Sequence, residues 1–172
     1  MTPLHNLLPI EPCLGPFPGF HRRRCGEASM SRVLLAGDHA LVRQRLRQFV
    51  EEHCEVIAEA TDGREAGRLA EALHPDIAIV DLGSAASTGL DITRRILTAW
   101  PSTRVIVLSV HSDEAYIRTT RSTGAAGFVL MDSADVDLVD AIREVPKGGF
   151  FVSPALGVAS SDLPDELPST DP

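Results

Sequence analysis

The sequence predicts a doubly wound α/β fold, in which helices cover both faces of a five-stranded parallel sheet. Two observations lead to this prediction. Short apolar runs alternate along the chain with longer amphipathic segments, and this order of strands and helices builds a layered open sheet with right-handed crossovers. Within each run every residue is apolar, rather than every second one, which is typical of strands that are buried on both faces.

The five expected strands lie on the apolar runs, and the expected helices lie between and after them. The runs span residues 33–36, 56–58, 77–80, 105–108 and 128–130. Helices are predicted at about 39–52, 64–73, 90–99, 113–122 and 134–145. The first has apolar residues at Val42, Leu46, Phe49 and Val50, so it presents one apolar face to the sheet.

Composition and charge limit the classes of protein to which the chain can belong. Its 172 residues are 44% hydrophobic and 23% charged, as expected of one globular domain. No apolar run approaches the roughly 18 to 20 residues of a membrane span, so no membrane partner is expected. The formal charge of −8 argues against a nucleic-acid partner, which usually meets a basic face. The three cysteines lack disulfide or zinc spacing, and a cytoplasmic location is expected.

Both ends differ in composition from the central region, which is expected to form one domain over residues 30–156. Residues 1–29 hold five prolines and a basic cluster without periodic pattern, and they are predicted to be disordered. The alternatives are a short interaction arm, or a start of translation at Met30 instead of Met1. Residues 157–172 form an acidic tail that is also predicted to be disordered.

Polar side chains follow the predicted strands at their carboxyl ends. Asp38 follows the first strand, Asp81 the third and Ser109 the fourth. The carboxyl ends of parallel strands meet at one edge of an open sheet, so these side chains are expected to converge there. A carboxylate that ends an apolar strand is costly to bury, and Asp81 therefore indicates a site. Asp38 has the alternative role of a helix N-cap, and His39 is expected at the surface.

Four segments, in order along the chain, resemble a response-regulator receiver domain of two-component signalling: VLLAGDHALVRQRLRQFV, IAIVDLGSAASTGLDITRRIL, RVIVLSVHSDEAYI and STGAAGFVLMDSADVDLVDAIREVPKGGFFVSPAL. The resemblance covers about residues 31–156 and is closest to receivers that precede a LuxR-type helix-turn-helix domain. It implies a flavodoxin-like, CheY-like sheet with strand order 2-1-3-4-5. About 20 residues follow Val152, too few for that DNA-binding domain, so a stand-alone receiver is expected.

The resemblance implies a role for each residue that matches the family pattern. Asp81 would be the phosphoacceptor, which attacks the phosphohistidine of a histidine kinase or phosphotransfer protein and forms an acyl phosphate. Mg²⁺ would be held by Asp38, Asp81 and the backbone carbonyl of Gly83. Ser109 would donate to the phosphate, or is only a hydroxyl satisfied at the end of its strand. Phe128 would be the aromatic switch residue, or is an ordinary core residue.

Two residues depart from the family pattern in ways that affect this chemistry. Gly37 stands where the family usually has an acid, and Met131 where it usually has a lysine. Neither can replace the usual hydrogen bonds. Because an acid and a lysine are both lost, the charge of the pocket stays at −2, and attraction for Mg²⁺ is expected to survive. Residues 83–88 lack the usual Met-Pro pair, so a looser loop is expected there.

The leading prediction is a stand-alone receiver that is phosphorylated on Asp81 and signals through contacts with an unknown output protein. A pseudo-receiver, whose state is set by a partner without phosphorylation, is the alternative that Met131 favours. A remnant of a DNA-binding regulator that has lost its helix-turn-helix domain is a further alternative. Enzymatic functions are disfavoured, because an aspartyl-phosphate phosphatase needs a second acid at the position of Gly83.

The distribution of charge on the first and last helices suggests a weak homodimer. The first helix is basic and the last is acidic, and the resemblance places the two side by side. Their charges can pair within one molecule or, in part, between the helices of two molecules. Exposed ion pairs are weak and screened by salt, so a dimer of this kind should be weak. The residues concerned are Arg43, Arg45, Arg47, Asp135, Asp137, Asp140 and Glu144.

Overall fold

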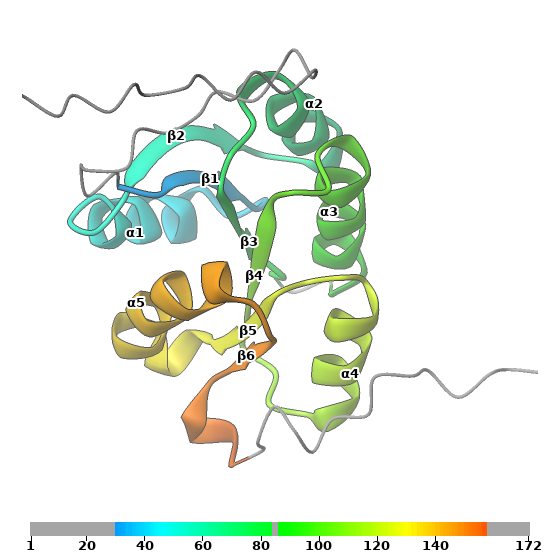
Figure 1. Ribbon diagram of the computed structural model, residues 1–172. Helices are drawn as coiled ribbons and strands as arrows, with labels where there is room; N and C mark the ends of the chain where they lie inside the picture. Colours follow the sequence, from blue (N-terminus) through cyan, green and yellow to red (C-terminus); the bar gives the residue numbers. More distant parts are fainter. Residues whose placement is uncertain (1–29, 84–85, 158–172) are drawn as a thin grey trace, which may run out of the picture.

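The computed structural model describes residues 30–83 and 86–157, and these form one parallel sheet with helices on both faces (Figure 1). The strand order is β2-β1-β3-β4-β5-β6. All the strand pairs are parallel. The predicted fold class and the order of the first five strands are confirmed. The strands are β1 (Arg32–Ala36), β2 (Glu55–Ala60), β3 (Ile77–Asp81), β4 (Arg104–Ser109), β5 (Gly127–Leu130) and β6 (Phe151–Val152).

Five α-helices connect these strands and lie in two layers. They are α1 (Ala40–Val50), α2 (Gly63–Leu73), α3 (Ala86–Ala99), α4 (Glu114–Ser122) and α5 (Ala134–Glu144). Helices α1 and α5 lie side by side on one face of the sheet, and α2, α3 and α4 cover the other (Figure 1). Three short 3-10 turns complete the described chain: η1 (Met131–Ser133), η2 (Val145–Lys147) and η3 (Pro154–Leu156).

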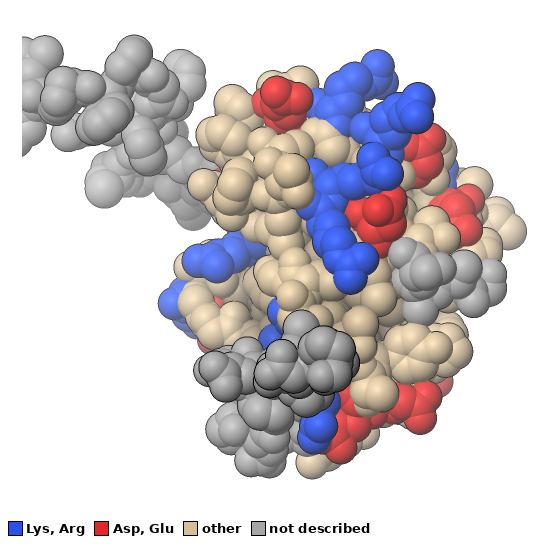
Figure 2. Space-filling model, turned by 90° about the vertical axis from the view of Figure 1, so that its right-hand side faces the viewer, with Lys and Arg blue, Asp and Glu red and all other residues tan. Residues whose placement is uncertain are grey.

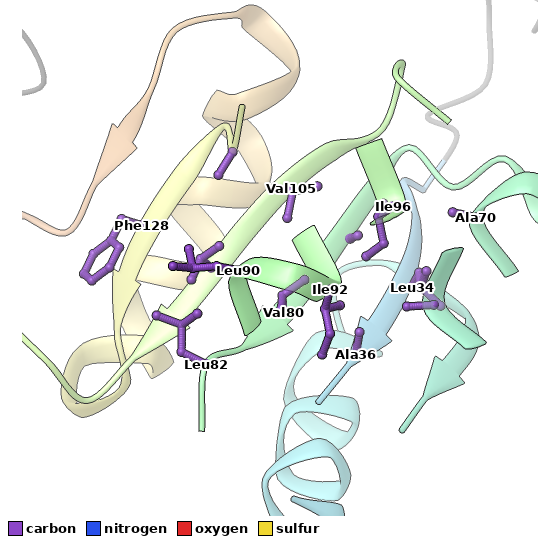
Figure 3. Close-up of a cluster of buried hydrophobic side chains, with 14 of the residues drawn as sticks. Leu34, Ala36, Ala70, Val80, Leu82, Leu90, Ile92, Ile96, Val105 and Phe128 are labelled. Carbon is purple, nitrogen blue, oxygen red and sulfur yellow. The ribbon is translucent and has the colours of Figure 1, made fainter. Parts of the chain in front are cut away.

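Alternate residues of each strand supply two separate hydrophobic cores. In β1, Leu34 packs under α2 and α3, whereas Leu35 packs under α1 and α5. Figure 3 shows the first of these cores, where Leu34 and Val80 of the sheet point toward Ile96 of α3. Because both faces are covered, every residue of β3 is buried, which explains the continuous apolar runs in the sequence.

Two features of the sheet and its helices differ from the sequence-based expectation. The sixth strand, β6, was not predicted, because its two residues are too few to give a recognisable run. Helix α3 begins at Ala86, not at 90, so the expectation of a loose loop through Thr88 is wrong for residues 86–88. Gly89 lies inside this helix, and a Cβ there would be 2.8 Å from Leu82 Cα. The glycine therefore permits a close crossing of α3 over the chain that follows β3.

The ends of the chain lie outside this description. The segments predicted to be disordered, 1–29 and 157–172, fall on residues that are not described, apart from Gly157. Within residues 30–83 and 86–157, none of the helices is sufficiently long and apolar to cross a membrane. Figure 2 looks onto α2, α3 and α4, where arginine side chains lie among acidic ones, as in the 2.6 Å ion pair of Arg95 with Asp91.

Candidate functional site

The candidate site lies at the carboxyl edge of the sheet, where β1 and β3 are neighbours and the strand order reverses. Ala36 of β1 pairs with Val80 of β3, so the residues after both strands leave the sheet side by side. Ser109, the last residue of β4, pairs with Leu130 at the end of β5. The topology thus gathers the ends of four strands at one edge.

Asp81 is the most buried carboxylate of this edge. The residue is 4% exposed, and its Oδ1 accepts a hydrogen bond of 2.9 Å from the backbone N–H of Gly83. Its Oδ2 is buried and has no hydrogen-bond partner among the described residues. An unsatisfied buried acceptor costs about 1–3 kcal/mol, and more when it is charged. The unsatisfied oxygen therefore indicates a partner that the described residues do not supply.

Asp38 and His39 follow β1 and lie over Asp81. His39 Nδ1 is 2.8 Å from Oδ1 of Asp38 and 3.5 Å from Oδ2 of Asp81. The three residues offer ligand atoms that all lie within 4.8 Å of one another. Asp38 does not cap α1, because the N-cap position belongs to His39, whose side chain makes no capping hydrogen bond.

His39 was expected at the surface, and the structure confirms that it is exposed. What the sequence did not predict is the contact of its ring with the site. Its side chain is 47% exposed, but the exposed ring places Nδ1 between two carboxylates. The only sequence signal was its position directly after Asp38 at the end of a strand. That signal does not reveal which way the imidazole turns.

Two glycines shape the space around these side chains. A Cβ on Gly37 would lie 2.9 Å from Asp81 Cβ, so any side chain there would displace the buried carboxylate or the strand end. The Gly37 carbonyl accepts a 2.6 Å hydrogen bond from Arg43 Nη1. Gly83 has φ +57°, and a Cβ on it would lie 2.9 Å from both Asp38 Oδ1 and His39 Cε1. Gly83 thus leaves the room that Asp38 and His39 occupy.

The remaining predicted residues lie at the ends of β4 and β5. Ser109 is 1% exposed, and its Oγ accepts a 3.0 Å hydrogen bond from the backbone N–H of His111, which leaves the hydroxyl proton free to donate. Phe128 is fully buried in the core that also contains Leu34 and Ile96 (Figure 3). Met131 packs against the core under α1 and α5, together with Leu46 and Leu138.

A pocket of about 500 Å³ opens between α1 and the start of α5, next to Met131. Five of its eight lining residues are apolar and three are charged. It is lined by Val42, Arg45, Leu46, Phe49, Met131, Asp132, Ala134 and Asp135. The Met131 side chain therefore belongs to the surface between α1 and α5.

Comparisons with known proteins point to one family. A sequence profile of the response regulator receiver domain matches residues 33–143. The transcriptional regulatory protein DegU of Brevibacillus brevis is 31% identical over 125 residues, which cover 72% of this chain and 53% of that protein. LiaR of Bacillus subtilis, also named a transcriptional regulatory protein, is 37% identical over 121 residues, covering 69% of this chain and 57% of its own length.

A solved structure shows the same architecture. The two-component response regulator of the LuxR family from Aurantimonas is 32% identical, with a TM-score of 0.69, and the match covers 75% of this chain and 94% of that one. This chain spans a little more than half of the two curated relatives, 53% of DegU and 57% of LiaR.

The contact of Gly37 with Asp81 leads to a prediction about stability. Gly37→Ala should lower the free energy of unfolding by about 1–3 kcal/mol, because the new methyl group has no space. The same substitution at Gly67 is the control, since a Cβ there meets its nearest neighbour at an ordinary 3.5 Å. Gly67→Ala should raise the free energy of unfolding by about 0.5–1 kcal/mol, because glycine is unfavourable inside a helix. Urea denaturation measures both, and equal stability of the Gly37 variant and the parent chain would contradict the packing argument.

Proposed function

Because this chain belongs to the response regulator receiver domain family, we propose that it is a phosphoacceptor switch of two-component signalling and that Asp81 accepts the phosphoryl group. The observation that carries the proposal is the buried Asp81 carboxylate at the edge where the strand order reverses, whose Oδ2 has no hydrogen-bond partner among residues 30–83 and 86–157. Receiver domains are in general phosphoacceptor switches and not enzymes. Any catalysis here would be confined to the chain's own phosphorylation.

The proposed step transfers a phosphoryl group from nitrogen to oxygen. A carboxylate oxygen of Asp81 attacks phosphorus of a phosphohistidine on a histidine kinase or phosphotransfer protein, and an acyl phosphate forms. The P–N bond breaks, its electron pair returns to the imidazole of the donor, and that nitrogen takes up a proton. The Ser109 hydroxyl, whose proton is not used by its contact with His111, is suited to donate to a phosphoryl oxygen.

Receiver domains generally bind Mg²⁺ at an acidic pocket, and the residues present here fit a divalent cation in part. Asp38, Asp81 and the backbone carbonyl of Gly83 would hold it, and the unpartnered Oδ2 of Asp81 supports this assignment. A bound divalent cation offsets charge that gathers on the phosphoryl oxygens. Gly37 supplies no third carboxylate, so the oxygen set is smaller than the family pattern.

Output is proposed to pass through contacts with other proteins, because the family match covers the described domain, whose site lies at an edge that a partner can reach. The pseudo-receiver remains a second candidate, and one observation favours it. Met131, in the place of the usual lysine, packs against the apolar core under α1 and α5, where it offers no hydrogen bond to a phosphate. Phe128, proposed as a switch, is already fully buried and would have little further to turn.

The charges that suggested a homodimer are partly used within the molecule. Arg43 and Arg47 both contact Glu59 of β2, at 3.4 and 2.8 Å, rather than the acids of α5. Arg45 lines the pocket between α1 and α5, as do Asp132 and Asp135. We therefore propose that any homodimer uses this face and involves few ion pairs.

Phosphorylation of Asp81 is tested directly by mass. Incubation with a small acyl phosphate and a divalent cation should add one phosphoryl group, since the carboxylate is the nucleophile. Asp81→Asn should abolish the addition, whereas Asp113→Asn, which changes an exposed acid before α4, should leave it intact. Intact-protein mass spectrometry measures all three. Labelling that persists in Asp81→Asn would disprove the assignment.

The role of position 131 separates the receiver from the pseudo-receiver. Met131→Lys should speed labelling of Asp81 by about tenfold or more, because it returns a cation to a site where negative charge gathers. Met131→Leu keeps an apolar side chain of similar size and should label at the parent rate. Labelling rates with the same acyl phosphate provide the measurement. Equal rates for the lysine and leucine variants would favour a pocket that does not respond to phosphate.

Self-association is expected to be weak and dependent on salt. Exposed ion pairs contribute only about 0–1 kcal/mol each and are screened as ionic strength rises. Sedimentation velocity at low and high salt, with and without a beryllofluoride phosphate mimic, should show a dimer only at low salt. Reversal of charge in Arg45→Glu should abolish it, and Arg104→Glu, on β4, is the control. A monomer under all four conditions would exclude the homodimer.

A further inference from the structure

We infer that Asp38, His39 and Asp81 form a mixed nitrogen and oxygen site that binds a borderline first-row cation, such as Zn²⁺ or Co²⁺, more tightly than Mg²⁺. The inference rests on the proposed function, because it names the cation class for the same pocket. It assigns a ligand role to His39, an imidazole that would stand in for the missing acid at Gly37.

The three side chains already stand at distances that suit one small ion. Ligands about 2.0–2.2 Å from a zinc ion lie no more than about 4.4 Å from each other. His39 Nδ1 is 2.8 Å from Oδ1 of Asp38 and 3.5 Å from Oδ2 of Asp81, and no pair in the group exceeds 4.8 Å. The side chains of His39 and Asp38 are 47% and 49% exposed, so both can rotate by the small amount that closure requires.

Asp81 supplies independent evidence for a ligand at this position. Its side chain is only 3% exposed, and its unpartnered oxygen is the one that faces His39 Nδ1. Exposed acids gather on many surfaces without binding anything, but a buried carboxylate oxygen without a donor is costly. A cation between Oδ2 and Nδ1 would satisfy Oδ2, while Nδ1 would exchange its 2.8 Å contact with Oδ1 of Asp38 for a bond to the ion.

The two glycines of the site account for the change in the ligand set. Gly37 has no side chain, so position 37 brings no further oxygen ligand to the pocket. Gly83 has no side chain either. A Cβ at this position would lie 2.9 Å from His39 Cε1 and 3.1 Å from Nδ1, so a larger residue would exclude the imidazole. Together they leave two carboxylates and one imidazole around the same space.

This ligand set discriminates between cations by their chemistry. Mg²⁺ requires oxygen ligands in a nearly regular octahedron, and an imidazole nitrogen is a poor ligand for it. Zn²⁺ and Co²⁺ accept imidazole and carboxylate together. The neutral imidazole has a lone pair on only one nitrogen, so Nδ1 would bind the ion while Nε2 carries the proton. Water can complete the coordination from the exposed side.

The test measures cation binding to the full chain in the absence of any phosphoryl donor. Isothermal titration with Zn²⁺ and with Mg²⁺ should give tighter binding of Zn²⁺. His39→Asn removes the imidazole but keeps a residue favoured at a helix N-cap. It should weaken Zn²⁺ binding by about tenfold or more, because loss of even an outer-shell partner commonly costs about 10–100-fold. Binding of Mg²⁺ should change little.

A matched control and a spectroscopic readout identify the ligand. His53→Asn changes an exposed histidine just beyond the other end of α1 and should leave Zn²⁺ affinity at the parent value. With Co²⁺, the proton on Nε2 of a coordinated imidazole gives a strongly shifted NMR resonance. This resonance should occur in the parent chain and in His53→Asn, and it should be absent in His39→Asn.

The failure of this inference can be told apart from failure of the proposed function. Labelling of Asp81 in Mg²⁺ is measured in parallel. If Asp81 is labelled but His39→Asn binds Zn²⁺ as the parent does, or keeps the shifted resonance, the inference is wrong and the receiver function stands. If the chain binds neither cation and Asp81 is not labelled, both are wrong.

Discussion

The parallel pairing of β1 with β3 sets the distance between the ends of these two strands at the carboxyl edge of the sheet. The candidate site depends on that distance. Ala36 pairs with Val80, so the next residues along the two strands, Gly37 and Asp81, become direct neighbours. Their separation leaves no space for a Cβ on Gly37. Asp81 is held at this place because the rest of β3 is buried on both faces by the two cores. Core packing thus fixes the carboxylate, and the carboxylate restricts what β1 can place beside it.

The departures at Gly37 and Met131 have different physical consequences. Loss of an acid next to Asp81 lowers the number of oxygen ligands, and His39 brings a nitrogen to the same space. Loss of the lysine has no such replacement at position 131, because Met131 faces the apolar core under α1 and α5. A pocket altered in this way can keep its attraction for a divalent cation while its response to phosphate weakens. The proposed binding of a cation and the proposed response to phosphorylation therefore rest on different residues and can be tested separately.

Much of the fold could be predicted from sequence because the strands are buried on both faces. Continuous apolar runs such as Ile77 to Val80 give a strong signal, and the helices between them follow from their spacing. The start of α3 could not be predicted, since it depends on how closely Gly89 approaches Leu82 in space. For the site, Asp38, Asp81 and Ser109 could be predicted as candidates because each follows or ends a strand at its carboxyl end.

Features that depend on the direction of a side chain could not be predicted from the sequence. His39 was expected to be a surface residue, and nothing in the spacing reveals that its Nδ1 lies between Asp38 and Asp81. The basic face of α1 was expected to meet α5 or a second molecule. Two of its arginines, Arg43 and Arg47, contact Glu59 of β2 in the same molecule, whereas contact with a second molecule stays a prediction. Glu59 lies beyond the point at which the register of β2 with β1 shifts, between Val33 and Leu34.

A switch requires contacts that differ between two states, and Ser109 is the point at which this structure connects the site to a helix. Its Oγ accepts a hydrogen bond from the backbone N–H of His111, and the His111 ring stacks on Tyr116 of α4 with centroids 4.7 Å apart. A phosphoryl group on Asp81 shifts the balance of states only by the difference in its interactions with each. If Ser109 turned toward that group, the bond to His111 would be strained or lost, and the stack on α4 would be affected. Phe128 is fully buried in this structure, and its role as a switch stays a prediction. The printed contacts of Ser109 and His111 make the segment from β4 to α4 the route that we propose for the coupling.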